Sequence, residues 1–387
     1  MAKINRKKQR RNLLILLCAF LLILGVFVKV VFMIVDTLFV SEQKVGEKQE
    51  SKKENKLSKE DYTKYVVDEL GNVPVMMYHG IHNIPSNETG YVGGNVDVDG
   101  YQRTAEAFRQ DLQFYYDNGY RMIRLNDYIN GNIDVEAGKS PICLTFDDGL
   151  ENNILVTGTD KEGNINIDPN CAVGILESFK KKYPDFNVTA TFFVNGGLFR
   201  QPEYNEQIIK WLVENGYDVG NHTYSHVDFT TTDGQIAQQE VGSVYAMLDE
   251  IIPGQYVNIV ALPFGSPYSY DHEMIPYIQS GLYKGKQYTT QSMLQVAWEA
   301  DYSPYSNQFN PAFIKRIRAY DNNGQDFDIE MNFTTLETTK YISDGDPNTI
   351  VIPANKQDML GNVYDKMLSR IKLRRLVYDF FKFRIET

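Results

Sequence analysis

Cysteine, histidine and tryptophan are all scarce in this chain of 387 residues, which contains three, five and two of them respectively. One cysteine, Cys18, lies within a long hydrophobic run, which leaves Cys143 and Cys171 for the rest of the chain. Two cysteines are too few for a disulfide framework. We therefore expect a hydrophobic core to stabilise the protein, and 43% hydrophobic residues can supply one.

Positive charge is also scarce beyond the first 12 residues. Residues 1–12 contain six Lys or Arg and no acidic residue, so the remainder has 33 basic against 50 acidic residues and a formal net charge of −17. An acidic surface repels the phosphate backbone of nucleic acids. The predicted partners therefore exclude nucleic acid.

One long apolar run is present, and it directly follows the basic residues. Residues 13–35 are interrupted by a single charge, Lys29, and are long enough to cross a hydrocarbon core of about 30 Å. The basic residues 1–12 predict a cytoplasmic N-terminus. The sequence thus predicts a single-pass signal anchor in the cell membrane, with the rest of the chain extracellular.

A cleaved signal peptide is the competing interpretation of residues 13–35. No small-x-small cleavage site follows the run, and Leu17 precedes Cys18 where lipoprotein processing favours a small residue. An uncleaved anchor is therefore favoured. Residues 36–72, rich in Lys and Glu, predict a solvated stalk, and we expect the folded domain to span 73–387.

Short apolar runs alternate with helical patterns throughout the predicted domain. Strand candidates include residues 73–79, 120–125, 141–146, 187–194, 217–222, 257–264 and 293–298. Helical spacing separates them: Phe108, Leu112 and Tyr115 recur at this spacing before Gly119, residues 204–216 end in Gly216, and a third run contains Val241, Val244 and Leu248. About seven strand-helix units predict an α/β fold with a parallel sheet, either open or closed into a barrel.

Two adjacent carboxylates end one strand candidate, in the sequence LTFDDG at residues 144–149. Functional groups of parallel α/β folds gather at the carboxyl ends of strands, where Asp147 and Asp148 are expected to lie. Asp-Asp-Gly is also an ordinary turn composition. A second chemical element is needed to decide between a turn and a site.

The sequence GNHTYSH, residues 220–226, supplies that element at another strand end. His222 and His226 are four residues apart, a spacing at which two imidazoles can bind one metal ion. Two histidines and a carboxylate suit Zn²⁺ and leave a position open for water, while Fe²⁺, Co²⁺ and Mn²⁺ remain alternatives. One aspartate then has a use as a ligand, and its neighbour as a proton acceptor.

A third element is ALPFGSP, residues 261–267, at the end of a further strand candidate. Pro263 directs the turn, and the backbone N–H of Phe264 can face a developing oxyanion. Alone, this sequence is an ordinary Pro-Gly turn.

Together these motifs resemble the polysaccharide deacetylases of carbohydrate esterase family 4, which carry the NodB homology domain. LTFDDG resembles the first family motif, residues 222–226 the second, and ALPFG the third, over a match of about residues 73 to 300. The resemblance implies a distorted (β/α) barrel. It also implies that Asp147 is the general base and that Asp148, His222 and His226 bind a divalent metal, with Zn most expected and Co, Fe, Mn or Ni as alternatives.

Two departures from the family pattern affect the proton transfers. Ala261 occupies the usual arginine position of the third motif, which predicts that Asp147 lacks the cation that orients the base. No histidine follows His272, so the family's usual general acid has no counterpart in its last motif.

Two further residues are candidates for the substrate side of the site. His79 ends the first strand candidate and can line the site, although a buried or surface histidine without catalytic duty is the favoured interpretation. Trp298 falls near the family's fourth motif and can form an apolar wall for the acetyl methyl, or it can belong to the core.

The resemblance predicts a metal-dependent hydrolase that removes N-acetyl groups from an extracytoplasmic N-acetylhexosamine polymer. Peptidoglycan, poly-N-acetylglucosamine and chitin-like chains all fit that class. Two alternatives stay open, because the usual arginine and histidine are missing. One is a metal-containing glycan-binding protein without catalysis, and the other is an O-acetyl esterase acting on a polysaccharide.

Overall fold

The computed structural model describes residues 59–361 and 375–378 of the chain. The expected cytoplasmic tail 1–12, the anchor 13–35 and most of the expected stalk lie outside the described residues. Within the described residues, no helix combines the length and hydrophobicity needed to cross a membrane.

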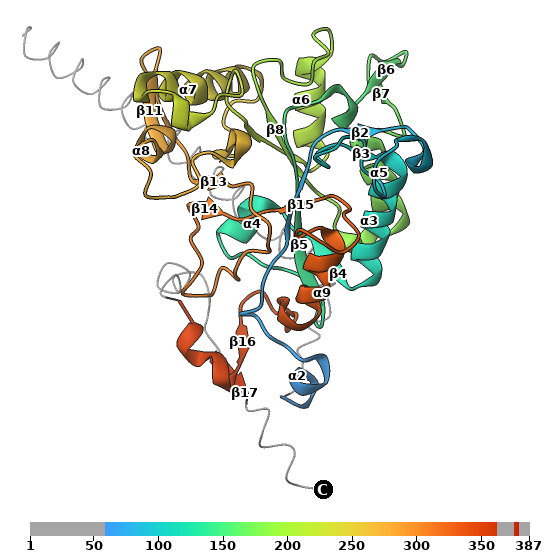
Figure 1. Cartoon of the computed structure of the whole chain (residues 1–387), viewed down its shortest axis with the longest axis vertical. Coiled ribbons are helices and arrows are strands. Elements are labelled where there is room, and N and C mark those ends of the chain that lie inside the picture. Colours follow the sequence, from blue (N-terminus) through green and yellow to red (C-terminus); the bar gives the residue numbers. More distant parts are fainter. Residues whose placement is uncertain (1–58, 362–374, 379–387) are drawn as a thin grey trace, which may run out of the picture. The chain divides into compact units, whose positions relative to one another are not determined.

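The described chain alternates between strands and helices (Figure 1). The α-helices are α2 Lys59–Tyr65, α3 Ala105–Asp117, α4 Leu125–Ile129, α5 Ala172–Lys182, α6 Asn205–Glu214, α7 Gly234–Ile251, α8 Ile275–Gln279 and α9 Ile329–Thr339. The strands of the main sheet are β1 Val75–Tyr78, β4 Tyr120–Met122, β5 Ser140–Phe146, β8 Thr191–Val194, β9 Asp218–Asn221, β10 Ile259–Ala261, β13 Ser292–Leu294, β14 Phe313–Ile314 and β15 Ile317–Arg318.

Shorter elements decorate this framework. The remaining strands are β2 Ile81–His82, β3 Arg103–Thr104, β6 Val156–Thr159, β7 Ile165–Ile167, β11 Ser280–Tyr283, β12 Lys286–Thr289, β16 Ile350–Pro353 and β17 Arg375–Tyr378. The 3₁₀ turns are η1 Ser86–Glu88, η2 Glu151–Asn153, η3 Pro184–Phe186, η4 Phe229–Thr231, η5 Pro263–Gly265 and η6 Ala354–Met359.

The main sheet is parallel, as the alternating pattern predicted. Its strand order is β14-β13-β10-β9-β8-β5-β1-β15, and β4 pairs with β5. Every strand pair in it is parallel. The carboxyl ends of these strands therefore meet at one edge, where side chains from distant parts of the sequence come together.

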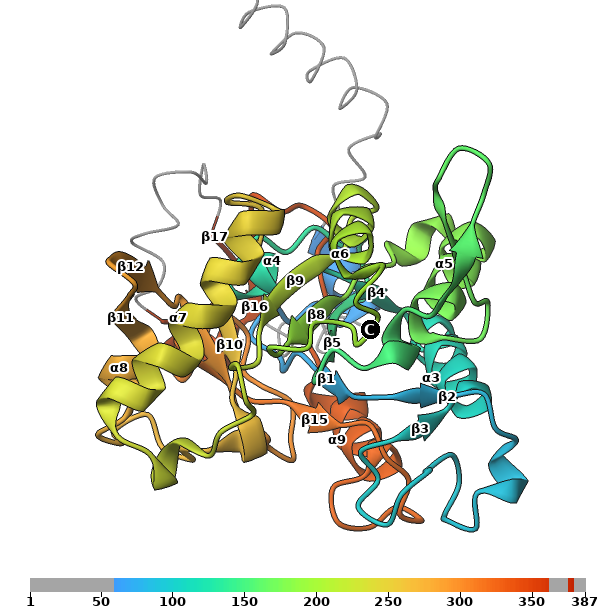
Figure 2. The same cartoon turned by 90° about the horizontal axis from the view of Figure 1, so that it is seen from above.

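The two outermost strands of this order come from one short segment. β14 pairs with β13 and β15 pairs with β1, although Lys315 and Arg316 alone separate β14 from β15 in the sequence. A segment that pairs with both ends of the sheet requires the sheet to curl round. Helices α3, α5, α6 and α7 lie on the outer side of the strands (Figure 2).

The core of the sheet consists of side chains from both the strands and the surrounding helices. β5 is buried along its whole length, and Phe146 stacks on Phe192 of β8 with ring centroids 4.9 Å apart. On α3, the predicted helical spacing places Phe108, Leu112 and Tyr115 in this core. Burial of such side chains contributes roughly 1.5–3 kcal/mol each. The rigid core fixes the strand ends that carry the site.

The folded domain begins earlier than the expected boundary at residue 73. Tyr62, Val67 and Leu70 are buried, and the main chain of Asp68 exchanges hydrogen bonds with Ile342. Glu69 is also buried, and its carboxylate accepts hydrogen bonds from the Tyr341 hydroxyl and the Val351 N–H, at 2.9 and 2.6 Å.

The high charge of residues 36–72 made the whole segment look like a solvated stalk. Its last part nevertheless packs on the domain through buried apolar side chains. The Glu69 carboxylate is tolerated there because several hydrogen-bond donors surround it. Burial nevertheless raises the pKa of Glu69 well above its ordinary value.

Candidate active site

The site lies at the carboxyl ends of β5 and β9, which the sheet holds on either side of β8. Asp147 and Asp148 follow β5, and His222 follows β9 directly. The Asp147 N–H continues the strand pairing by donating to the Tyr78 carbonyl at 3.0 Å. The main-chain conformation then changes, because Asp148 and Gly149 both have positive φ angles of 74° and 54°.

Gly149 allows the turn that separates the two aspartates. A Cβ at this position would lie 2.1 Å from the carbonyl oxygen of Leu198, so any residue other than glycine would clash with the main chain. The turn directs Asp147 inward and Asp148 toward the histidines. The sequence LTFDDG is therefore a turn and also carries two differently placed carboxylates, so the two interpretations do not exclude each other.

Asp148, His222 and His226 form a compact group. Their candidate ligand atoms all lie within 4.8 Å of one another, and Asp148 Oδ1 is 3.2 Å from His222 Nε2 and 3.4 Å from His226 Nε2. Burial raises the pKa of Asp148, but the close contact with His222 and the other neighbouring imidazoles outweigh it and lower the pKa below its ordinary range. The carboxyl group is thus ionised, as a ligand requires.

The ring of His222 is oriented for metal binding. Its Nδ1 makes a 2.9 Å hydrogen bond with the carbonyl of Ala261, while its Nε2 is buried without any hydrogen-bond partner. A carbonyl on one ring nitrogen fixes the tautomer that leaves the other nitrogen with a free lone pair. A buried, unpaired nitrogen facing a carboxylate and a second imidazole fits a divalent cation.

The loop between the two histidines is held from α7. Ser225 donates from its N–H and its hydroxyl to the Glu240 carboxylate, both at 2.7 Å. His226 adopts a left-handed backbone conformation with a φ of 57°, and Phe264 packs edge-on against its ring at 4.6 Å. These contacts return the chain so that His226 faces the same carboxylate as His222.

Asp147 is 1% exposed and is paired with an arginine that lies outside the three sequence motifs. Arg316 donates from both terminal nitrogens to the two carboxylate oxygens, each at 2.8 Å, and also contacts Thr145 at 3.2 Å. Its Nε donates to the Gln295 carbonyl at 2.8 Å. Burial raises the pKa of Asp147, but Arg316 outweighs burial and lowers the pKa below its ordinary value.

The expectation that Asp147 lacks an orienting cation was therefore wrong. Ala261 does occupy the usual arginine position of the third motif, and this alanine is fully buried in β10. Arg316 provides the cation from the segment between β14 and β15 instead. No sequence pattern marked Arg316, because the two-residue strands on either side of it, β14 and β15, are too short to show a periodicity.

His79 lies next to the two aspartates at the end of β1. Its ring is half-buried, its Nδ1 has no hydrogen-bond partner, and Tyr101 packs edge-on against it at 5.0 Å. Burial lowers the pKa of His79, against the opposite effect of Asp147 and Asp148. Asn153 donates to the His79 carbonyl at 2.7 Å and thereby ties β1 to the turn after Asp148.

The remaining candidates are less closely tied to this group. Pro263 is buried at the start of η5, and Phe264 is 56% exposed with a positive φ of 58°. Trp298 is 58% exposed and is not part of the core, and its ring stacks on Phe327 with centroids 6.4 Å apart. In the described part of the chain, no hydrogen bond or ring contact links Trp298 to the metal-binding residues.

Comparison with known proteins identifies the domain that carries this site. Residues 134–281 match the family model described as polysaccharide deacetylase, and this range includes Asp147, Asp148, His222 and His226. The segment that carries the site therefore matches polysaccharide deacetylases, as its resemblance to carbohydrate esterase family 4 predicted.

Curated relatives match over short stretches. Peptidoglycan-N-acetylmuramic acid deacetylase PdaA of Bacillus subtilis is 36% identical over 104 residues, which cover 27% of this chain and 30% of that protein. A 30.6 kDa protein of Geobacillus stearothermophilus is 32% identical over 30% of this chain and 35% of its own length. The chain thus matches about a third of the length of these relatives.

Among solved structures, the deacetylase PplD of Streptococcus pyogenes in complex with acetate aligns with a TM-score of 0.47 and 19% identity. The alignment covers 65% of this chain and 94% of that one.

Proposed function

We propose that the protein is a metal-dependent hydrolase that removes N-acetyl groups from an N-acetylhexosamine polymer. The observation that carries the proposal is the pairing of a buried, arginine-bound carboxylate, Asp147, with the ligand group of Asp148, His222 and His226. The two carboxylates have different partners, so they can have different functions. The name of the relative PdaA favours peptidoglycan among the candidate polymers.

A divalent metal bound by Asp148, His222 and His226, which we propose to be Zn²⁺, would supply a Lewis acid for the acetyl carbonyl and lower the pKa of water. Co, Fe, Mn and Ni are the alternatives. All other steps belong to side chains and main-chain groups of the protein.

Asp147 is the proposed general base. Arg316 keeps its carboxylate ionised and fixes its plane, so that an oxygen is available for the proton of the attacking water. Water adds to the acetyl carbon, the carbon–nitrogen bond then breaks, and the products are acetate and an amine. We propose that the N–H of Phe264, beside the ring of His226, faces the oxygen that becomes negative.

His79 is the proposed proton donor for the leaving amine. The family's usual histidine is absent from the last motif, whereas His79 lies beside both aspartates with an unpaired ring nitrogen.

We also propose that the domain forms a distorted (β/α) barrel. The proposed location is outside the cytoplasm, with residues 13–35 as a membrane anchor. Trp298 remains a candidate wall for the substrate.

Acetate release from acetylated glycan oligomers by the metal-loaded protein tests the proposed function. The Asp147→Asn variant is expected to lose about 10²- to 10⁴-fold in kcat, because it cannot accept the proton. Its metal content should be unchanged. If the wild-type protein binds the oligomers but releases no acetate, the glycan-binding alternative is correct. Release of acetate from ester-linked acetylated xylan alone would identify an esterase.

The His79→Gln variant tests the proton donor. Glutamine keeps a polar side chain of similar reach but cannot deliver a proton, so kcat should fall by about 100-fold or more while metal content is retained. Because burial lowers the pKa of His79, the protonated form is populated at lower pH than for an ordinary histidine, and activity should decline as pH rises through that pKa. This alkaline decline should be absent from the residual activity of the variant. An unchanged pH profile of kcat would exclude His79 as the donor.

A further inference from the structure

A second recess lies beside the candidate active site. It has a volume of about 630 Å³, within the range of about 300–1,000 Å³ that is usual for ligand pockets. One wall is formed by residues of the loop 90–99, and the other by residues of the segment 318–326, which follows β15. Apolar side chains at its rim, Tyr91 and Val98, are exposed.

The recess adjoins the active site through Tyr101. One contact of its ring is with His79 at 5.0 Å, and the other is with the guanidinium of Arg318 at 5.1 Å. Arg318 lines the recess and is two residues beyond Arg316, which binds Asp147.

Among the described residues, Arg318 has no polar partner of its own. Its guanidinium lies over the ring of Tyr320 at 3.8 Å, and its Nε is buried without a hydrogen-bond partner. Within residues 59–361, its side chain makes no ion pair and no hydrogen bond. Two tyrosine rings hold the guanidinium in place by cation–π contact and leave its donors available to a ligand.

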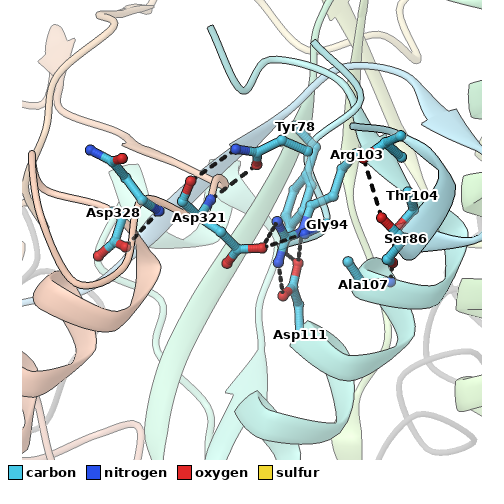
Figure 3. A network of polar contacts seen from close by, with 12 residues as sticks. Tyr78, Ser86, Gly94, Arg103, Thr104, Ala107, Asp111, Asp321 and Asp328 are labelled. Atoms are coloured by element: carbon cyan, nitrogen blue, oxygen red, sulfur yellow. Dashed lines mark hydrogen bonds and ion pairs between the residues drawn. The ribbon is translucent and has the colours of Figure 1, made fainter. Parts of the chain in front are cut away.

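The two walls are tied together by a buried polar network, shown in Figure 3. Arg103 binds the Asp111 carboxylate with both Nε and Nη2, at 2.5 and 2.6 Å, and reaches Asp321 at 3.0 Å. Gly94 N–H donates to the same Asp321 carboxylate at 2.7 Å. Asn95 exchanges two hydrogen bonds with the main chain of Asp321, at 2.8 and 3.0 Å.

This network makes the shape of the recess independent of a ligand. The walls are 226 residues apart in sequence where Asn95 meets Asp321, and partly buried charge-assisted bonds from Gly94 and Arg103 to the Asp321 carboxylate reinforce this contact. A preformed recess loses less entropy when a ligand binds than one that must first be ordered.

The chemistry of the lining selects the ligand. Asp97, Asp99, Asp321 and Asp326 make the recess acidic, which disfavours an anionic group despite Arg318. Three of these carboxylates already accept hydrogen bonds from the protein: Asp97 from the N–H groups of Tyr101 and Gln102, Asp321 from Arg103 and Gly94, and Asp326 from the Asn322 side chain. Carboxylate acceptors, one guanidinium and tyrosine rings together suit a neutral, hydroxyl-rich molecule with apolar C–H faces, which describes a pyranose ring.

We propose that this recess is a subsite for a sugar unit next to the one that is deacetylated, and that Arg318 binds its hydroxyl groups. The inference rests on the proposed function and adds the location of a neighbouring-sugar subsite and the residue, Arg318, that makes binding depend on chain length. Binding should therefore strengthen with chain length.

Two measurements on the full-length protein test the subsite. Acetate release by the metal-loaded protein and calorimetric binding to the Asp147→Asn variant are each compared for one to four β-1,4-linked N-acetylglucosamine units. Arg318→Met should reduce both the binding of the longer oligomers and acetate release from them by about tenfold more than for the monomer, as expected for lost charged hydrogen bonds. Arg109→Met, on the outer surface of α3, is the matched control and should not alter the dependence on length.

The outcomes separate this inference from the proposed function. Length-dependent binding that Arg318→Met abolishes, without acetate release by the wild type, would retain the subsite and reject deacetylation. Acetate release that is equally efficient for all lengths would retain deacetylation and overturn the subsite. A loss that is equal for monomer and tetramer in Arg318→Met would also overturn it, since Arg318 would then act at the reacting sugar.

Discussion

Replacing Arg316 with Met is expected to reduce kcat/KM by at least about 100-fold, because the general base loses the group that orients and ionises it. Both carboxylate oxygens of Asp147 are bound by Arg316 in a fully buried environment. Removing one partner of such a pair leaves a buried charge without compensation. Steady-state kinetics of acetate release would measure the loss.

The variant should also change the pH dependence in a defined direction. In the wild-type protein, Arg316 holds the pKa of Asp147 below its ordinary value in spite of burial, so the base is ionised at neutral pH. Without Arg316, burial is opposed only by the neighbouring His222 and His79, so the pKa should rise. The acid limb of kcat/KM should therefore move to higher pH, and the defect should lessen as pH rises between about 5 and 9.

A matched control is available in Arg103, which also binds a buried aspartate with two nitrogens. Arg316→Met and Arg103→Met should each destabilise the fold by roughly 3–5 kcal/mol, as measured by thermal unfolding. Arg316→Met alone should shift the acid limb for a monosaccharide substrate. Arg316→Lys, which keeps the charge without the paired geometry, should retain a lower pKa and part of the activity. Equal pH profiles for wild type and Arg316→Met would show that Arg316 does not act through Asp147.

Replacing His222 with Ala is expected to abolish stoichiometric metal binding and with it the acetate release. His222 is buried, its Nδ1 is fixed by the Ala261 carbonyl, and its Nε2 has no protein hydrogen-bond partner. Alanine removes one of three ligands and the tautomer that the carbonyl selects. Metal analysis of the purified protein after dialysis measures this directly, without relying on activity.

His272 offers the matched control for metal analysis. It lies outside the ligand group, and its Nδ1 accepts a hydrogen bond from the Met274 N–H at 3.2 Å. His272→Ala should keep the metal content of the wild type, whereas His226→Ala should lower it. If His222→Ala retains one equivalent of metal, the assigned ligand group is wrong, whatever the activity.

Much of the fold could be predicted because its signals are local. The spacing of Phe108, Leu112 and Tyr115 predicted α3, and the apolar run at residues 141–146 predicted β5. Glycine also marked the ends of the helices, as at Gly119 and Gly216. The metal-binding residues could be proposed for the same reason, since each motif ends a recognisable strand.

Other features depend on contacts between distant parts of the chain. β14 and β15 have two residues each, too few for any periodicity, and they become strands because β13 and β1 supply their pairing partners. Glu69 looked like part of a charged stalk because nothing nearby in sequence indicates Tyr341 and Val351. Trp298 was placed in a strand, although it is exposed beyond the end of β13.

The sequence by itself determined the chemistry that this protein can offer: two adjacent carboxylates, two histidines four residues apart, and strands and helices in an alternating order. The tertiary structure decided which charged side chains form ion pairs with each other. Arg316 is 169 residues from Asp147, and Arg103 is 218 residues from Asp321. A buried ion pair leaves no periodic trace in the sequence, because its two members are selected for each other by proximity in the folded chain.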